Sequence, residues 1–375
     1  MTDTELTITV RDDLTVVARR DDGAESPPGR LQMDDLHKDL IRIFEIWLTE
    51  PDRTWNRREL EVFGSLLYRS LFPAPVDELL RQSLIHADDD GRLRVQLSFT
   101  ERAGELARIP WEYLFYPSTG GRAGFFFATN PRVVLSRYIP LEAGRTTLRP
   151  DEDALRILVV VSKPIDLGPV HSDEVAAAIS ALSGEFPLVL SSLAQPTPEK
   201  LMAALSDSKP HVLHFMGHGR YNEAEGQGEI ALVGPGGAVL WYSDAMLAEL
   251  VDHVRAVPRL IVLHACEGAT TDVRDRFAGM APQLIRMGVQ AVVAMQYLVS
   301  NRAAIRFSTA FYQQLGAGKP IDHAIQEGRY SLTQTPPPAG QTRLLGIPVL
   351  YMHSRDGIIQ PASVADAYPR IGTAE

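Results

Sequence analysis

From residue 156 onwards, short apolar runs alternate regularly with amphipathic stretches, and this alternation limits the possible folds more than any other feature. Continuous apolar runs are typical of strands that are covered on both faces of a sheet. They occur at 157–161, 188–193, 211–215, 260–265 and 291–295. Helical periodicity occurs between and after them, at 172–182, 197–204, 243–254, 279–286, 301–315 and 320–332. Strands that alternate with helices of this length predict an α/β fold, with a mainly parallel sheet sandwiched by helices.

The first part of the chain has a different pattern, which predicts an N-terminal α+β region packed on that sheet. Two alternating runs at 5–10 and 14–19 predict a hairpin, and helical stripes follow from about residue 34, at 57–71 and at 75–85. Further strands are expected at 93–99, 125–128, 133–138 and 348–352, and the aromatic run 111–116 is expected to pack in the core. The polar stretch 145–153 is the best candidate for the boundary between this N-terminal region and the domain that contains the alternating strands and helices. The predicted divisions are 1–90, 91–150 and a main domain at 151–355, followed by a tail at 356–375.

Charge and cysteine content exclude several classes of function. The net charge is −10 and the basic residues are scattered, which argues against a direct nucleic-acid surface or an anionic-membrane surface. No apolar stretch is long enough to span a membrane, and the acidic N-terminus does not resemble a secretory signal. A single cysteine rules out an internal disulfide and a thiolate zinc cluster. We therefore expect a cytoplasmic protein with no cofactor.

Two of the predicted strands end in residues that can carry chemistry. The strand at 260–265 leads directly into Cys266, and the strand that begins at His211 leads into His218 between Gly217 and Gly219. Parallel strands end at the same edge of a sheet, so a thiol and an imidazole would lie side by side. The alternatives are a buried core cysteine and a histidine exposed on a tight Gly-His-Gly turn.

Other interpretations of the same region are weaker. His211, His214 and His218 invite a metal site, but strand geometry points His211 and His214 to opposite faces, so we do not predict one. The excursion 220–228 is polar and contains glycine, and we expect it not to hold one shape; a hairpin is expected at 229–240. If this excursion gates the site, the isolated chain should be poorly active until a partner orders it.

The residues around Cys266 and His218 resemble the CHAT family of caspase-like peptidases, which are relatives of separases, caspases and metacaspases. The histidine lies 266 − 218 = 48 residues before the cysteine, close to the separation of about 50 residues in caspases. The resemblance covers roughly residues 90–355. It also includes Ile-Pro-Trp-Glu-Tyr-Leu at 109–114, Ile-Leu-Val-Val-Val-Ser at 157–162, the segment 288–294, the helix through 311–312 and Gly-Ile-Pro-Val-Leu-Tyr at 346–351.

This resemblance implies a cysteine endopeptidase that cleaves a specific protein, in a regulated bacterial signalling or defence pathway, with an activating sensor or partner protein. It implies that the Cys266 thiolate forms a thioester and that His218 transfers protons. Backbone N–H groups of Gly219 and Cys266 would form the oxyanion hole. The expected rim of the substrate groove contains Lys163, Asp166, His264, Gln296 and Tyr297.

The chain departs from its relatives in ways that bear on specificity. Many CHAT proteins carry a tryptophan and an aspartate in the stretch where this chain reads Gln-Tyr-Leu-Val-Ser-Asn, at 296–301. Metacaspases place an aspartate at the position of His264. Asp166 could hold a cation or Lys163 an anion. We expect P1 to be selected mainly by shape and by backbone pairing. Two other functions fit the same pattern: a catalytically idle scaffold module, and a small-molecule cysteine hydrolase.

Overall fold

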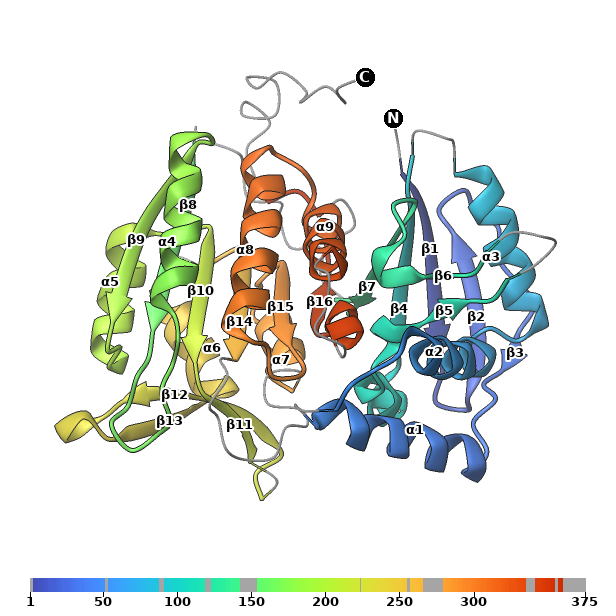
Figure 1. The fold of residues 1–375 in the computed structure, drawn as a ribbon, viewed down its shortest axis with the longest axis horizontal. Coiled ribbons are helices and arrows are strands. Elements are labelled where there is room, and N and C mark those ends of the chain that lie inside the picture. Colours follow the sequence, from blue (N-terminus) through green and yellow to red (C-terminus); the bar gives the residue numbers. More distant parts are fainter. Residues whose placement is uncertain are drawn as a thin grey trace.

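A computed structural model shows one large twisted sheet with helices on both faces (Figure 1). It describes residues 3–50, 53–87, 91–118, 123–141, 154–222, 224–254, 257–265, 279–334, 341–354 and 357–359. The main sheet has 11 strands in the order β3-β2-β1-β4-β7-β16-β15-β14-β10-β8-β9. This confirms the α/β class, and it shows that the N-terminal strands belong to the same sheet.

Five strands form a parallel block in the C-terminal half, which we call the C-terminal block. Its members pair in the order β9-β8-β10-β14-β15, and every pairing between them is parallel. The strands are β8 (Leu155–Val161), β9 (Leu188–Ala194), β10 (Val212–Gly217), β14 (Leu260–Ala265) and β15 (Ala291–Met295). All five were predicted to within two residues at each end, because continuous apolar runs mark buried parallel strands.

A second parallel block, the N-terminal block, runs β1-β4-β7-β16 and meets the first at the antiparallel β15–β16 pair. Its strands are β1 (Thr4–Val10), β4 (Leu93–Phe99), β7 (Val133–Tyr138) and β16 (Pro348–Met352). The antiparallel strands β2 (Thr15–Arg20) and β3 (Gly29–Arg30) close that side. The N-terminal region was predicted to pack on the sheet, but its strands extend the same sheet instead. They join it because the free edge of β16 pairs with β7. The predicted boundary at 145–153 lies outside the described residues.

Alternation of side chains along the strands divides the core between the two faces of the C-terminal block. On one face, residues such as Val159 and Val262 share a core with α4, α8 and α9 and with the N-terminal helices. On the other face, Leu158 and Ile261 pack on α5, α6 and α7. The helices are α1 (Asp35–Thr49), α2 (Arg57–Leu71), α3 (Ala74–His86), α4 (Asp173–Ala181), α5 (Pro198–Ser208), α6 (Asp244–His253), α7 (Met280–Arg286), α8 (Asn301–Gly316) and α9 (Ile321–Thr333).

Several helix starts are fixed by capping residues. The Asp34 carboxylate accepts from the His37 N–H at the start of α1, and Pro198 occupies the first turn of α5 behind the Thr197 cap. Shorter elements complete the fold: β5 (Phe115–Tyr116), β6 (Phe125–Phe126) and the 3-10 turns η1 (Glu101–Arg108), η2 (Trp111–Tyr113), η3 (Phe127–Thr129), η4 (Leu182–Gly184), η5 (Pro235–Gly237) and η6 (Gln341–Gly346). Trp111 and Tyr113 are fully buried, as expected for core packing.

The excursion after His218 differs from its prediction. It forms a second, three-stranded sheet from β11 (Gly219–Asn222), β12 (Gln227–Val233) and β13 (Val239–Ser243), in which β12 and β13 make the predicted hairpin. Arg220 pairs with Glu229 across β11 and β12, and its guanidinium lies 4.2 Å from the Trp241 ring centroid. These cross-strand contacts give β11 and β12 a defined shape, which corrects the expectation that polar sequence prevents one.

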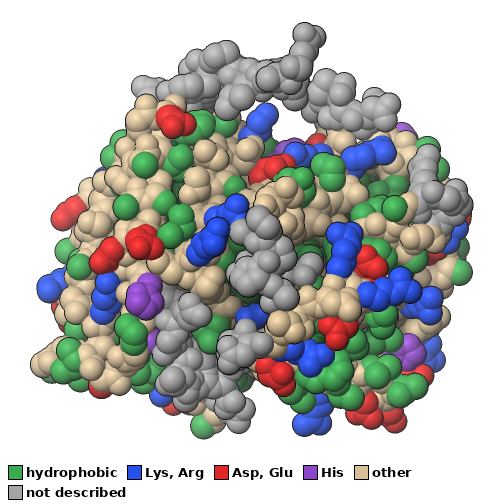
Figure 2. Space-filling view, viewed as in Figure 1, with side chains coloured by type: hydrophobic (Ala, Val, Ile, Leu, Met, Phe, Trp, Pro, Cys, Tyr) green, Lys and Arg blue, Asp and Glu red, His purple; other side chains and the backbone are tan. Residues whose placement is uncertain are grey.

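The surface is mixed in charge on the face that Figure 2 shows, with acidic and basic side chains interspersed. Hydrophobic side chains gather at its lower right, where α1 lies in Figure 1. On α1, Leu36 is 66% exposed and Ile46 47% exposed. Among the described residues, no helix has both the length and the hydrophobicity needed to cross a bilayer.

Candidate active site

The C-terminal ends of β10 and β14 form the centre of the candidate site. These strands are adjacent and parallel, and Gly217 is the register partner of Ala265. His218 follows Gly217 directly, and Cys266 follows Ala265 in the sequence but lies outside the described residues. The predicted adjacency of the two strands is therefore present, with both ends at one edge of the sheet.

His218 is held from two sides. The residue is 4% exposed, and its Nε2 lies 2.8 Å from the carbonyl oxygen of Gly168 in the β8–α4 loop. The Ala231 N–H donates to the His218 carbonyl oxygen at 2.9 Å, which fixes the backbone. A carbonyl oxygen can only accept, so in the neutral ring Nε2 carries the proton and Nδ1 carries the lone pair. The ring is thus set to take a proton at Nδ1.

Sequence analysis did not find this role for Gly168. The group that orients His218 is a backbone carbonyl, which every residue type possesses, so no residue type in the sequence marks it. The only available signal was that Gly168 lies in a loop after a strand of the same sheet, on the side where His218 was expected.

The glycine before His218 is required by close packing. A Cβ built on Gly217 would lie 2.8 Å from the Phe215 ring and 3.2 Å from the Ser162 Cβ, so a side chain has no room there. Ser162 itself donates from its backbone N–H to the Met216 carbonyl and from its hydroxyl to the Ala231 carbonyl. Gly219 begins β11 opposite Ile230. The oxyanion-hole role of Gly219 and Cys266 remains a prediction.

His264 belongs to a buried chain of polar side chains under the site. Its Nδ1 lies 3.5 Å from His214 Nε2, and His214 Nδ1 lies 3.0 Å from the Tyr312 hydroxyl on α8. All three residues are almost fully buried, and His264 Nε2 has no hydrogen-bond partner among the residues that the structure describes. Burial lowers the pKa of His264 to about 4, and burial followed by the neighbouring His264 lowers the pKa of His214 well below its usual value.

This geometry corrects the prediction that His264 lies on the rim of a groove. Its side chain is 1% exposed and faces α8, because it shares the strand face of Val262, which is also buried. Both imidazoles are neutral near pH 7, since charging either would require desolvating an ion in the core.

Lys163 and Asp166 lie in the β8–α4 loop, and each has a partner. The Lys163 ammonium pairs with Asp173 at 3.1 Å on the surface. The Asp166 carboxylate accepts from the Val239 N–H at 2.9 and 3.1 Å, which ties the loop to β13. The structure therefore gives Asp166 a tethering contact and Lys163 a surface ion pair. The substrate-binding role of both residues remains a prediction.

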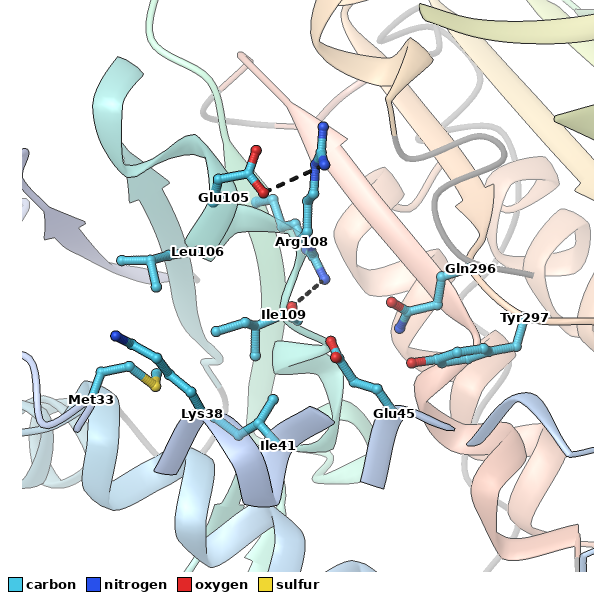
Figure 3. A pocket seen from close by; sticks show the side chains of 11 residues that line it. Met33, Lys38, Ile41, Glu45, Glu105, Leu106, Arg108, Ile109, Gln296 and Tyr297 are labelled. Atoms are coloured by element: carbon cyan, nitrogen blue, oxygen red, sulfur yellow. Dashed lines mark hydrogen bonds and ion pairs between the residues drawn. The ribbon is translucent and has the colours of Figure 1, made fainter. Parts of the chain in front are cut away.

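Gln296 and Tyr297 follow β15 and line a cavity of about 400 Å³ with residues of α1, η1 and β7 (Figure 3). The Gln296 side-chain amide donates to Glu112 at 3.2 Å and to the Gly346 carbonyl oxygen. Glu112 forms a bidentate ion pair with Arg137, at 2.9 Å for Nε–Oε1 and 2.5 Å for the second contact. Burial alone would lower the pKa of Arg137, but the Glu112 carboxylate raises it, so the arginine is charged.

The three histidines considered for a metal have separate partners. His211 Nδ1 accepts from the Arg156 N–H at 3.1 Å, while His214 contacts Tyr312 and His218 contacts Gly168. Burial lowers the pKa of His211 to about 4. Within the described ranges, no group of three or more potential metal ligands occurs.

A sheet with helices on both faces, with a buried histidine at the carboxyl end of its central parallel strands, places the protein in the α/β class. The CHAT domain model matches residues 61–358, and the chain belongs to the CHAT family. Helix α1 precedes the matched region.

Comparison with solved structures found the Saccharomyces cerevisiae separase–securin complex. One crystal structure has 10% sequence identity and a TM-score of 0.44, covering 93% of this chain and 30% of that chain. A second has 11% identity and a TM-score of 0.36, covering 83% and 20%. The chain thus spans less than a third of the length of either separase chain. A comparison with curated proteins gave no match.

Proposed function

We propose that the chain is a cysteine endopeptidase that cleaves a specific protein through His218 and Cys266. The observation that carries this proposal is the orientation of His218, whose Nε2 lies at hydrogen-bond distance from the Gly168 carbonyl oxygen. His218 follows β10 directly, and β10 ends beside the end of β14. Membership of a caspase-like peptidase family supports the reaction class. Cys266 follows the neighbouring strand in sequence with no intervening residue, and we therefore assign its thiol as the nucleophile that His218 serves.

The proposed reaction has two steps, acylation of Cys266 and hydrolysis of the acyl-enzyme. His218 Nδ1 takes the proton of Cys266 Sγ, and the thiolate attacks the scissile carbonyl carbon to give a tetrahedral oxyanion. The N–H groups of Gly219 and Cys266 stabilise this oxyanion. On collapse, the C–N bond breaks and the imidazolium gives its proton to the leaving amine. Water then loses a proton to His218 and attacks the thioester, which releases the acid and restores the thiol.

Recognition depends on an extended segment of the target. Lys163 and Asp166 have partners within the protein, and His264 is buried, so none of them presents a dominant charge to P1. Backbone pairing over several residues therefore supplies much of the affinity. Short fluorogenic peptides should be poor substrates compared with a whole protein. The physiological setting that we propose is a regulated bacterial signalling or defence pathway in the cytoplasm, with a protein activator.

Proteome-wide mapping of new N-termini tests the proposal. Lysate treated with the wild-type chain should show a small set of cleavage sites that are absent with Cys266→Ala and with His218→Ala. The same sites with either variant would exclude the dyad. No cleavage with any form, while all forms capture the same protein, would indicate an idle scaffold instead.

A further inference from the structure

The two end strands of the main sheet differ in how they are protected, and Figure 1 shows them at opposite ends of the molecule. Strand β3 at one end has two residues, Gly29–Arg30, and follows Pro27 and Pro28. Strand β9 at the other end has seven residues, with no proline and no charge among them. Soluble proteins usually shorten an edge strand or place proline or charge on it, because its free backbone groups can pair with another strand. Strand β9 has none of these protections.

The hydrogen-bond pattern between β9 and β8 shows which backbone groups of β9 are free. The Gln195 N–H donates to the Val161 carbonyl oxygen at 3.0 Å, just beyond the end of β9. Because alternate residues of a strand point to the same neighbour, the odd-numbered residues of β9 face β8. The even-numbered residues Leu190, Ser192 and Ala194 therefore point their N–H and C=O groups away from β8. These groups have no hydrogen-bond partner within the described ranges of the chain.

An identical strand fits this edge in one register. If two copies of β9 pair antiparallel with Ser192 on the two-fold axis, Ser192 faces its counterpart, and Leu190 faces Ala194 of the other copy. Each free residue then meets a free residue, so every free N–H meets a free carbonyl oxygen. No charged side chain lies on β9, so this pairing buries no charge from the strand.

Helix α5 carries two charges that fit the same axis. It packs on β8 and β9, so the second copy would bring its own α5 alongside, antiparallel and on the same face of the sheet. Lys200 and Asp207 are seven residues apart and share one side of α5, whereas Leu201 and Leu205 are buried against the sheet. A crossover from β9 through α5 to β10 is right-handed, and this places the side with Lys200 and Asp207 toward the free edge.

These two charges are available to a partner. Lys200 and Asp207 are both exposed, and neither has an ion-pair partner in the part of the chain that the structure describes. Across the axis, Lys200 of each copy would lie beside Asp207 of the other, with the small side chains of Ala203 and Ala204 between the two helices. An unrelated strand at this edge would leave both charges unpaired. The charge pattern therefore favours a second copy of this chain over an extended segment of another protein.

We propose that two copies of the chain join through β9 into one continuous sheet, antiparallel about a two-fold axis at Ser192, with Lys200 of each α5 beside Asp207 of the other. The dimer is closed, because each copy uses its unprotected edge and leaves only β3 at either end. The carboxyl ends of β10 in the two copies point in opposite directions, so the two candidate sites stay apart. This inference goes beyond the proposed function and does not depend on it.

Sedimentation equilibrium of the full chain tests for the dimer. With increasing concentration, the average mass should rise from 41.4 kDa toward twice that value and no further. Amide hydrogen exchange locates the interface, since the N–H groups of Leu190, Ser192 and Ala194 should exchange more slowly as the dimer forms. Exchange in β3 should not change with concentration.

Variants at Ser192 test the strand pairing. Ser192→Lys places like charges opposite each other on the axis, and Ser192→Pro removes an N–H that β8 does not use. Each should raise the dissociation constant of the dimer about tenfold or more, while thermal unfolding shows that the chain stays folded. Ser206→Lys adds a lysine at an exposed position of α5 outside the proposed contact, and it should leave the dissociation constant unchanged.

Exchange of the charges on α5 tests the identity of the partner. Lys200→Glu alone, or Asp207→Lys alone, puts like charges together at both symmetric contacts and should weaken the dimer about tenfold. A negative charge near the start of the helix and a positive one near its end also favour α5 itself, so neither change should unfold it. Mixing the two single variants should restore the dimer, since each copy then meets the opposite charge at both contacts.

Four results would overturn the proposal: a monomer at every concentration, open-ended oligomers, a dimer that is unaffected by the Ser192 variants, or a mixture of charge variants that dimerises no better than each variant alone. Protection of β9 only after another protein is added would also overturn it, in favour of strand addition by that protein. These outcomes leave the proposed peptidase untouched, because cleavage is not among the quantities measured.

Discussion

The N-terminal and C-terminal blocks of the sheet bury polar groups in opposite ways. The N-terminal block buries ions: Glu112 and Arg137 are 1% and 3% exposed, and Arg94 lies between the carboxylates of Asp3 and Asp322. The C-terminal block buries neutral rings, namely those of His214, His264 and Tyr312.

The difference separates buried polar groups that join distant segments of the fold from those that lie beneath the candidate active site. The buried ion pairs join segments far apart in the sequence, such as β4 and the start of α9 through Arg94 and Asp322. The neutral rings keep charge out of the core beneath β10 and β14, next to the strand end that carries His218. Substitutions in the two blocks should therefore have different signatures.

The largest effect is expected for Glu112→Gln in the N-terminal block. This change leaves the Arg137 charge buried without its counter-ion, which costs about 3–5 kcal/mol of unfolding free energy. Urea denaturation measures it. The matched control is Glu105→Gln, whose pair with Arg108 is on the surface and should contribute less than about 1 kcal/mol. Equal losses for the two variants would remove the distinction between buried and exposed pairs.

The two blocks should lose stability in different pH ranges, and His264 sets the range for the C-terminal block. The folded pKa of His264 is about 4, below the ordinary value near 6.5, so the unfolded chain binds a proton first as the pH falls. Stability should be lost between about pH 6.5 and pH 4, on the order of 3 kcal/mol from this residue. His264→Asn should flatten the curve in that window, and an unchanged slope would contradict the assignment.

The carboxylates of the N-terminal block should affect stability in a lower pH range than the histidines. Burial raises the pKa of Asp3, but its contacts with His323, Arg92 and Arg94 lower it well below the ordinary value of 3.8. Its contribution is therefore present above that value and is lost only as the pH falls further. Asp3→Asn should change the curve below about pH 4 and leave the histidine window unaffected.

A smaller loss is expected for Tyr312→Phe. Removing the hydroxyl leaves His214 Nδ1 buried without its partner, at a cost of about 1–3 kcal/mol. Calorimetric unfolding measures it. A double variant with His214→Phe should cost less than the sum of the two single changes, since the orphaned nitrogen is also removed.

The smallest effect is expected for Lys163→Gln, which breaks a surface pair with Asp173. Such pairs contribute roughly 0–1 kcal/mol, so the unfolding midpoint should hardly move. If Lys163 does hold a substrate anion, cleavage of the native target would fall although stability does not. Measuring both quantities on one variant keeps the two roles apart.

The elements of the fold were largely readable from hydrophobic periodicity, because buried strands and amphipathic helices leave strong patterns. Strands β4, β7, β15 and β16 and helix α2 have the predicted bounds. The sequence did not show that the N-terminal strands join the same sheet. That arrangement depends on the edge of β16 that stays free when β16 pairs antiparallel with β15. Pairing between distant strands leaves no local pattern.

The site was readable only in part. Strand ends with glycine, histidine and cysteine predicted that β10 and β14 are parallel neighbours, as they are, but the Gly168 carbonyl has no side chain that could mark it. His264 was misplaced because its position beside the cysteine was given more weight than its face of the strand. Glu112 was overlooked as a single acid in an aromatic run, although it anchors Arg137 and Gln296.

The most direct test of the central claim is the alkylation rate of Cys266, which reports on one site because the chain has a single cysteine. Iodoacetamide reacts with the thiolate, and a free thiol has a pKa of about 8.5. With His218 beside it, the wild-type thiol should react with a pH midpoint below that value. His218→Ala should raise the midpoint and slow the reaction at pH 7 about tenfold, whereas His253→Gln at the end of α6 should do neither. Identical rate profiles for wild type and His218→Ala would contradict the pairing of His218 with Cys266.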